Sequence, residues 1–378
     1  MTPAGVWLVA LLSVAGVSAT DRDGSILDAA KQGDSAAVRT LLRKGVDVNT
    51  AEPDGTTALH WAVRANHLET ARLLVSAGAN VNLATRYDVT PLSLAATNGS
   101  TVLIRTLLKA GANPNARGIA GETTLMTAAR TGRLDALNEL LAHGADVNAS
   151  ERSQQQTALM WASLENHGEV VRTLLKHGAD PNVRSKVLTP PEWRWATSGM
   201  VSTPLPRGGW TALMYAAREN AIDAAAALAD AGADLNLVDP DGTTALVLAI
   251  VNAHFDLANT LLEKGANPSI PDQTGTAALY AAVDMHTLWP MIARPTPKLT
   301  GTMDAAALVK ALLAHGANPN AQLTRVPFSR YHEPADQALG VGTTPLMRAA
   351  KSNDVPVMRM LLEAGADPTL TQNDYTNA

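Results

Sequence analysis

Nine histidines are the residues with which metal or acid–base chemistry would begin in this 378-residue sequence. Imidazole binds zinc and titrates near neutral pH. No two of the histidines have H-x-x-x-H spacing, and the chain has no cysteine, so neither a helical zinc pair nor a thiolate site is predicted. Most of them lie in a turn between short helices or just before a helix-ending glycine, where a cation can bond the last carbonyls. The nine are His60, His67, His143, His167, His177, His254, His286, His315 and His332.

Carboxylates and nucleophiles give no catalytic pattern either. Several aspartates follow a glycine in the pattern G-[AV]-D, which is a turn position with a solvated side chain, and nothing selects a catalytic pair. The sequence lacks G-x-x-x-x-G-K-[ST], G-x-G-x-x-G after a strand, and G-x-S-x-G. We therefore predict no catalytic residue, no cofactor and no metal site. A hydrolytic site built by the insertions is an alternative that no paired nucleophile and base supports.

The elements that carry these residues are short amphipathic helices. In the stretch 55–82, two apolar stripes at helical spacing are separated by a polar break at 65–67. Thr57 stands where it can cap the first helix, and Gly78 stands where a left-handed residue would end the second. Helices this short are marginal in water by themselves. The unit must therefore stack on copies of itself.

Copies of this unit recur along the chain. Leu59, Leu92 and Leu125 begin equivalent stripes 33 residues apart, and equivalent leucines follow to Leu346. The helix-ending glycines keep the same step. They are Gly45, Gly78, Gly111, Gly144, Gly178, Gly232, Gly265, Gly316 and Gly365. A period of this length repeated so often predicts one extended array of repeats.

The repeat resembles the ankyrin repeat family. The resemblance is carried by TALHWA (57–62), TPLSLAA (90–96), TALMYAA (211–217) and TPLMRAA (344–350), each followed by a segment such as LLKAGANPN (107–115). It covers about residues 24 to 378. The resemblance implies an all-α ankyrin-repeat solenoid of about nine helix-turn-helix repeats with finger loops and three insertions, a fold used for protein binding.

Domain boundaries follow from the repeat and from its interruptions. Residues 24–50 lack the Thr-Ala-Leu entry and carry several charges, which predicts an N-terminal capping repeat. The array is expected over 51–371, with insertions near 183–209, 285–304 and 321–341. Residues 372–378 match the start of a further, truncated repeat.

Residues 1–19 contain no charged side chain and an apolar run that ends in Val17-Ser18-Ala19. Small residues at these positions predict a signal peptide cleaved after Ala19, and so a protein that is exported to a periplasm or secreted. A membrane anchor is the alternative, but the run is shorter than the roughly 20 residues that a span needs.

Candidate partner-binding residues come from two sources. Aromatic side chains in or beside the insertions either hold those loops to the stack or anchor a partner, and Trp, Tyr and Arg dominate interface energetics. The family resemblance adds the finger tips and the exposed side of the first helices, whereas Trp61 and Trp161 are expected to pack against a neighbouring repeat. The candidates are Arg64, Tyr87, Arg130, Trp193, Trp195, Trp210, Arg218, Trp289, Phe328 and Tyr331.

The predicted function is that of an exported ankyrin-repeat scaffold that binds another protein and has no catalytic activity of its own. A net charge of −5 without a sustained basic stripe argues against nucleic acid. No membrane span is expected after signal cleavage. The alternative is a recognition arm of a larger enzyme or receptor whose catalytic part lies beyond the C-terminus of this chain.

Overall fold

The computed structural model describes residues 25–188, 208–286, 299, 301–325 and 340–372. Its described part contains 18 α-helices and, apart from isolated bridges such as Ala51 with Thr57, no β-structure. The chain divides into two compact units, Met1–Asn80 and Val81–Ala378, called unit 1 and unit 2 below. The all-α class predicted from the sequence is confirmed. Residues 1–24, which include the predicted signal peptide, the interiors of the three insertions and residues 373–378 lie outside the described residues.

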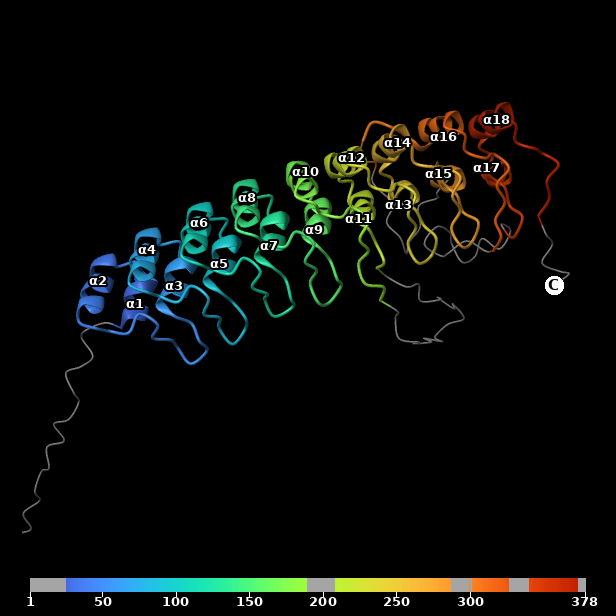
Figure 1. The fold of residues 1–378 in the computed structure, drawn as a ribbon. Coiled ribbons are helices and arrows are strands. Elements are labelled where there is room, and N and C mark those ends of the chain that lie inside the picture. The colour runs from blue at the N-terminus through green and yellow to red at the C-terminus, as the bar shows by residue number, and fades with distance from the viewer. Residues whose placement is uncertain (1–24, 189–207, 287–298, 300, 326–339, 373–378) are drawn as a thin grey trace, which may run out of the picture. The chain divides into compact units, whose positions relative to one another are not determined.

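Unit 1 holds two helix pairs, and unit 2 holds the other seven (Figure 1). In unit 1 the pairs are α1 (Ile26–Gln32) with α2 (Ser35–Arg43), and α3 (Ala58–Arg64) with α4 (Leu68–Ser76). The pairs of unit 2 are α5 (Pro91–Thr97) with α6 (Thr101–Lys109), α7 (Thr124–Arg130) with α8 (Leu134–Ala142), α9 (Ala158–Leu164) with α10 (Gly168–Lys176), α11 (Ala212–Arg218) with α12 (Ile222–Asp230), α13 (Ala245–Val251) with α14 (Phe255–Glu263), α15 (Ala278–His286) with α16 (Ala305–Ala314), and α17 (Pro345–Lys351) with α18 (Val355–Glu363).

Local residue chemistry sets where these helices begin and end. Thr57 caps α3 by accepting the N–H of His60, and Thr90, Thr123, Thr157, Thr211, Thr244 and Thr344 cap the equivalent helices. Gly78, with φ of 87°, takes the left-handed conformation directly after Ala77, the C-cap residue of α4. Both predictions made from the stretch 55–82 are thereby confirmed.

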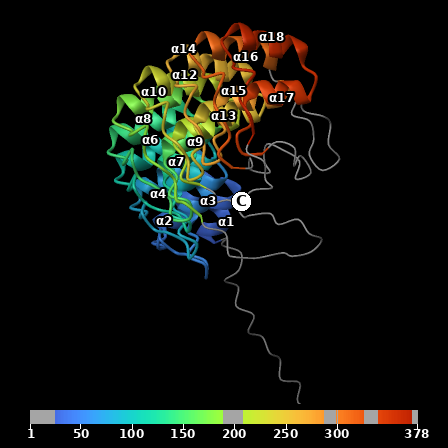
Figure 2. The same ribbon diagram turned by 90° about the vertical axis from the view of Figure 1, so that its right-hand side faces the viewer.

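Helices of one kind pack side by side within unit 2. Each first helix contacts the first helix of the next pair, as α7 contacts α9 and α15 contacts α17, and the second helices do likewise. In Figure 2 the first helices of this unit form its inner side and the second helices its outer side. Leu92, Leu125 and Leu159 are each 1% exposed, so the equivalent leucines form the apolar layer between neighbouring pairs.

A ladder of asparagine side chains joins the ends of the second helices. Asn115 accepts the N–H of Asp146 at 2.7 Å and donates to the carbonyl of Gly144 at 2.9 Å. Asn82, Asn148 and Asn320 make the same two kinds of bond with the following pair. Each bond gives a partner to a carbonyl or N–H of the turn that follows a second helix.

The finger loops run from each second helix to the next first helix. A short backbone bond closes each finger, for example Thr85 N–H to the Val89 carbonyl at 3.0 Å and Asp239 N–H to Thr243 at 2.9 Å. Neighbouring fingers are also linked, because the N–H of Arg152 donates to the Ala120 carbonyl at 2.8 Å. The fingers of unit 2 are therefore fixed by their own main chain.

Candidate functional site

The last turn of the first helices places a cation against an aromatic ring. Arg130 ends α7, and its guanidinium carbon lies 5.3 Å from the centroid of Trp161 on the neighbouring helix α9. A cation over an indole face is attracted by the ring quadrupole, worth about 0.5 to 1 kcal/mol where it is exposed. Arg130 is exposed and Trp161 half-buried, so the pair presents a fixed, charged aromatic surface.

Trp161 is held in place by hydrogen bonds that cross two fingers. Its Nε1–H donates to Gln156 at 3.0 Å, and the amide of Gln156 donates to the Tyr215 hydroxyl at 2.9 Å. Tyr215 in turn donates to the Ser185 hydroxyl at 3.2 Å. The chain of bonds connects α9 with α11 and with the finger that precedes it. The rings on this face are therefore oriented before any partner arrives.

A second cation–aromatic group lies at the end of α11. The Arg218 guanidinium carbon is 5.0 Å from the Trp210 ring centroid and 5.6 Å from that of Tyr215. The two rings meet edge to face at 5.4 Å with an interplanar angle of 67°. Arg218 Nε also donates to Glu219 at 2.5 Å, which limits how far the side chain can swing. Two residues predicted from the sequence, Trp210 and Arg218, therefore lie in one cluster.

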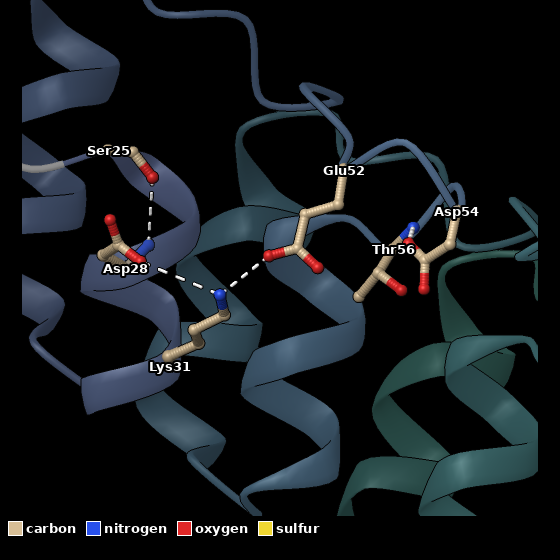
Figure 3. Close-up of polar contacts among 6 residues, drawn as sticks. All are labelled: Ser25, Asp28, Lys31, Glu52, Asp54 and Thr56. Carbon is tan, nitrogen blue, oxygen red and sulfur yellow. Dashed lines mark hydrogen bonds and ion pairs between the residues drawn. The ribbon is translucent and has the colours of Figure 1, made fainter.

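Unit 1 carries a related group at its own helix ends. Lys31 Nζ lies 4.5 Å from the Trp61 centroid and donates to Glu52 at 2.7 Å, while Arg64 lies 5.5 Å from the same ring. Figure 3 shows the ammonium between Glu52 and the more distant Asp28. The hydrogen bond to Glu52 raises the pKa of Lys31 despite some desolvation, so the cation stays protonated.

Histidines in the turn between the two helices of the next repeat bond the backbone of the two arginines. The Nε2–H groups of His167 and His254 donate to the backbone carbonyls of Arg130 and Arg218, each at 3.0 Å. Burial lowers the pKa of His254, with the Arg218 carbonyl and Glu219 opposing the change. These turn histidines therefore have a structural role at the repeat boundary. His143 likewise bonds the carbonyl of Glu139 at 2.8 Å, as its place before Gly144 predicts.

Between α15 and α17 the same helical positions hold an ion pair instead. Arg348 Nε donates to Asp284 at 2.6 Å, and the two side chains are 8% and 3% exposed. Arg348 also contacts the Ser352 hydroxyl, and His286 pairs with Asp354 at the adjoining helix ends. Each of these two buried charges compensates the other. Removing or exposing either one would leave the other buried without a partner charge, which is energetically costly.

Tyr87 lies on a finger tip rather than on a helix. It is 49% exposed, the Arg86 guanidinium carbon lies 4.8 Å from its ring centroid, and Arg86 Nη2 donates to its hydroxyl at 2.7 Å. The ring and the cation therefore form one exposed unit.

The structure thus places the described candidates in several groups rather than in one site. Arg130, Trp210 and Arg218 lie along the first helices of unit 2, Tyr87 lies on a finger of that unit, and Arg64 belongs to unit 1. The remaining candidates, Trp193, Trp195, Trp289, Phe328 and Tyr331, lie outside the described residues.

Sequence reasoning missed the partners of these cations. Trp161 was expected to pack against a neighbouring repeat and Tyr215 was not singled out, whereas both are rings that the arginines cover. The alignment of repeats places Trp161, Tyr215 and Arg348 each at the fourth residue of its helix, and Asp284 at the position of Arg130, but it does not show which side chains meet.

In the described residues, no three His, Asp or Glu side chains are gathered so that they could hold a metal ion. Nor is any described helix both long and apolar enough to cross a membrane. What the face offers is cationic and aromatic contact area on a fixed backbone, which suits recognition of another molecule.

A row of paired short helices with closed fingers and exposed Arg–aromatic groups defines a repeat-built scaffold. The family model for ankyrin repeats in three copies matches residues 26–118, 117–185 and 197–272, and the single ankyrin repeat model matches 341–373. The chain belongs to the ankyrin repeat family.

Comparison with solved structures gives the same fold. The crystal structure of the human ASB11 ankyrin repeat domain matches with a TM-score of 0.51 and 26% identity, covering 64% of this chain and 98% of that domain. A search of curated proteins finds no match. Ankyrin repeats are protein–protein interaction modules, and their fold is typically a non-catalytic binding scaffold.

Proposed function

We propose that this chain binds another protein through the first-helix face of unit 2, at the Arg130–Trp161 pair and the Trp210–Tyr215–Arg218 cluster. The observation that carries the proposal is that both groups combine Arg with Trp or Tyr on one face. These residue types dominate the binding energy of protein interfaces. The chain is proposed to have no catalytic activity of its own.

Preorganisation supports the same assignment. Binding normally costs about 0.5 to 1.5 kcal/mol for each flexible side chain that is immobilised. Trp161 is already fixed by Gln156, and Arg218 by Glu219 and two rings. Much of that cost is thus met during folding. A partner would gain the contact area of the rings and the charge of the guanidinium groups.

The test is capture of the partner from the native extract, identified by mass spectrometry. The variant Arg130→Ala/Arg218→Ala should lose the partner that the unchanged chain retains, with a circular dichroism melt close to that of the unchanged chain. The matched control is Lys109→Ala/Lys176→Ala, which removes exposed side chains on second helices and should keep the partner. Capture by the first variant, or loss by the control, would contradict the proposal.

Export is a separate proposal that rests on residues 1–19. Its support is the charge-free apolar run followed by Val17-Ser18-Ala19. Expressed in its native cell, the mature protein should begin at Thr20 and lie outside the cytoplasm. N-terminal sequencing of the purified protein, together with cell fractionation, checks this directly. An intact Met1 in a cytoplasmic fraction would refute it.

A further inference from the structure

The finger tips between residues 85 and 188 expose several large apolar side chains. Ile119 is 63% exposed, Tyr87 49% and Val187 47%. Arg86, Arg152 and Lys186, all exposed, lie at corresponding places on these fingers, each directly after the residue whose N–H closes the finger. We call these six residues the basic finger edge. All of them belong to unit 2.

The basic finger edge is presented by backbone that cannot easily move. The buried carboxylate of Glu151 accepts the N–H groups of Ser153, Gln154 and Gln156 at 2.6 to 3.0 Å. Burial works against its charge, yet these donors outweigh that effect and hold the pKa of Glu151 below its ordinary value. The finger that carries Arg152 is therefore fixed by an ionised carboxylate, whose two oxygens accept backbone N–H groups of the same finger.

Other charges on these fingers are used internally. Arg117 donates to the carbonyls of Gly121 and Ser150 at 3.2 and 2.7 Å, and Arg184 donates to those of Gly209 and Val238. Glu122 accepts the N–H of Ala120 at 3.1 Å. Asp88 is an exposed carboxylate on the same edge. The charges that remain directed to solvent are thus mainly cationic.

The next two fingers of unit 2 have the opposite character. Asp239, Asp241 and Asp272 are 3 to 6% exposed, and the carboxylates of Asp239 and Asp272 accept finger N–H groups. The places equivalent to Arg152 are held there by Pro240 and Gln273. The cationic character is therefore local to the fingers between 85 and 188. It is not a consequence of the whole chain, whose net charge is −5.

We propose that the basic finger edge binds an extended, acidic segment of a partner protein that carries apolar side chains between its carboxylates. This deepens the proposed function and rests on it. Asp and Glu would form charge-assisted bonds with Arg86, Arg152 and Lys186. Apolar side chains would cover Ile119 and Val187. A nucleic acid fits less well, because its phosphates would leave these two apolar side chains exposed.

Fluorescence anisotropy with two short labelled peptides tests this inference on the full chain. One peptide alternates Glu with Leu, and the other alternates Lys with Leu. The acidic peptide should bind and the basic one should not, and added salt should weaken the binding because the charges are exposed. A labelled oligothymidylate of equal length serves as the nucleic-acid probe and should bind more weakly than the acidic peptide.

Two variants with equal change of net charge locate the surface. Arg86→Glu/Arg152→Glu/Lys186→Glu should weaken binding of the acidic peptide roughly tenfold or more, since three attractive charges become repulsive. The control Lys109→Glu/Lys176→Glu/Arg359→Glu should bind nearly as well as the unchanged chain. Equal losses in both variants, or tighter binding of oligothymidylate, would overturn the inference. Circular dichroism melts establish that both variants fold.

Partner capture, read together with peptide binding, separates this inference from the proposed function. If the acidic peptide binds the finger-edge variant as well as it binds the unchanged chain, the acidic segment is not the ligand of this edge. Partner capture that still depends on Arg130 and Arg218 would then leave the proposed function standing. Capture that depends on neither surface would reject both.

Discussion

The step from α7 to α9 and the step from α15 to α17 use the same two helical positions for opposite purposes. In the first step, Arg130 is the seventh residue of α7 and lies over the ring of Trp161, which is the fourth residue of α9. In the second step these positions hold Asp284 and Arg348. The first pair is partly open to solvent, and the second is buried.

The difference shows that equivalent positions of one scaffold can serve recognition in one repeat and stability in another. A cation over a ring contributes little energy to folding and stays available to a partner. A buried ion pair is costly to form and still more costly to break, so its residues cannot serve a partner. At the second step a further pair, His286 with Asp354, joins the adjoining helix ends. We therefore expect substitutions at equivalent positions to affect binding at the first step and folding at the second.

The largest effect is expected at the buried ion pair. Arg348→Ala leaves Asp284 buried without its cation, which should destabilise the α17–α18 pair by about 3 to 5 kcal/mol. Hydrogen exchange of the amides in α17 and α18 measures the loss. Amides in α7 and α9 should exchange at an unchanged rate.

A double replacement checks that the cost comes from the orphaned charge. Arg348→Met with Asp284→Leu removes both charges, and should recover most of the stability, since apolar residues can replace a buried pair at little cost. If the double variant is as unstable as Arg348→Ala, the pair was not the source of the stability. That result would make packing of the Arg348 chain the dominant contribution.

An intermediate effect is expected for the ring of the first step. Trp161→Ala removes a half-buried aromatic side chain and its bond to Gln156, which should cost about 2 kcal/mol of unfolding free energy. Urea unfolding followed by circular dichroism gives the value. Trp161→Phe keeps an aromatic ring but lacks the indole N–H, so it should lose less than half of the stability that Trp161→Ala loses.

A smaller effect is expected for the cation itself. Arg130→Ala should cost about 0.5 to 1 kcal/mol, the range for an exposed cation–ring contact, and should add little when Trp161 is already Ala. A double-mutant cycle with the same unfolding measurement provides the coupling energy. Full additivity of the two substitutions would show that the guanidinium and the ring do not interact.

The smallest effect is a pH dependence at His254. Its pKa is lowered in the folded chain by burial, from an ordinary value of 6.5. The unfolded state therefore binds the proton first as the pH falls, so the stability present above about pH 6.5 is lost between that pH and the folded pKa. Between about pH 7.5 and 5.5, the unchanged chain should lose slightly more stability than His254→Gln. Parallel curves for the two proteins would refute this assignment.

Much of the fold could be predicted because it is local. Thr57 caps a helix through a residue three positions away, and Gly78 ends one through its own φ, so both effects lie within a few residues of sequence. The period then multiplies each local feature. The first-helix cations Arg130 and Arg218 were predicted as candidates because the family resemblance implies that partners bind the exposed side of the first helices.

The candidate site was less predictable because its contacts cross repeats. Gln156 reaches Tyr215 over 59 residues, and Arg348 reaches Asp284 over 64. An insertion lies between the members of each pair in sequence, so the spacing alone could not reveal them. Tyr87 could be placed on a finger from the sequence, but its stacking under Arg86 depended on side-chain conformations.

By itself, the sequence determined the repeated helix pair, its ends and the family, since short-range chemistry and a regular period are sufficient for these. Only the tertiary structure decided that Arg130 meets a ring while Arg348 meets a carboxylate. The physical reason is that the strength of a charge interaction depends on burial and on distance in space, and neither quantity is contained in a linear pattern of residues.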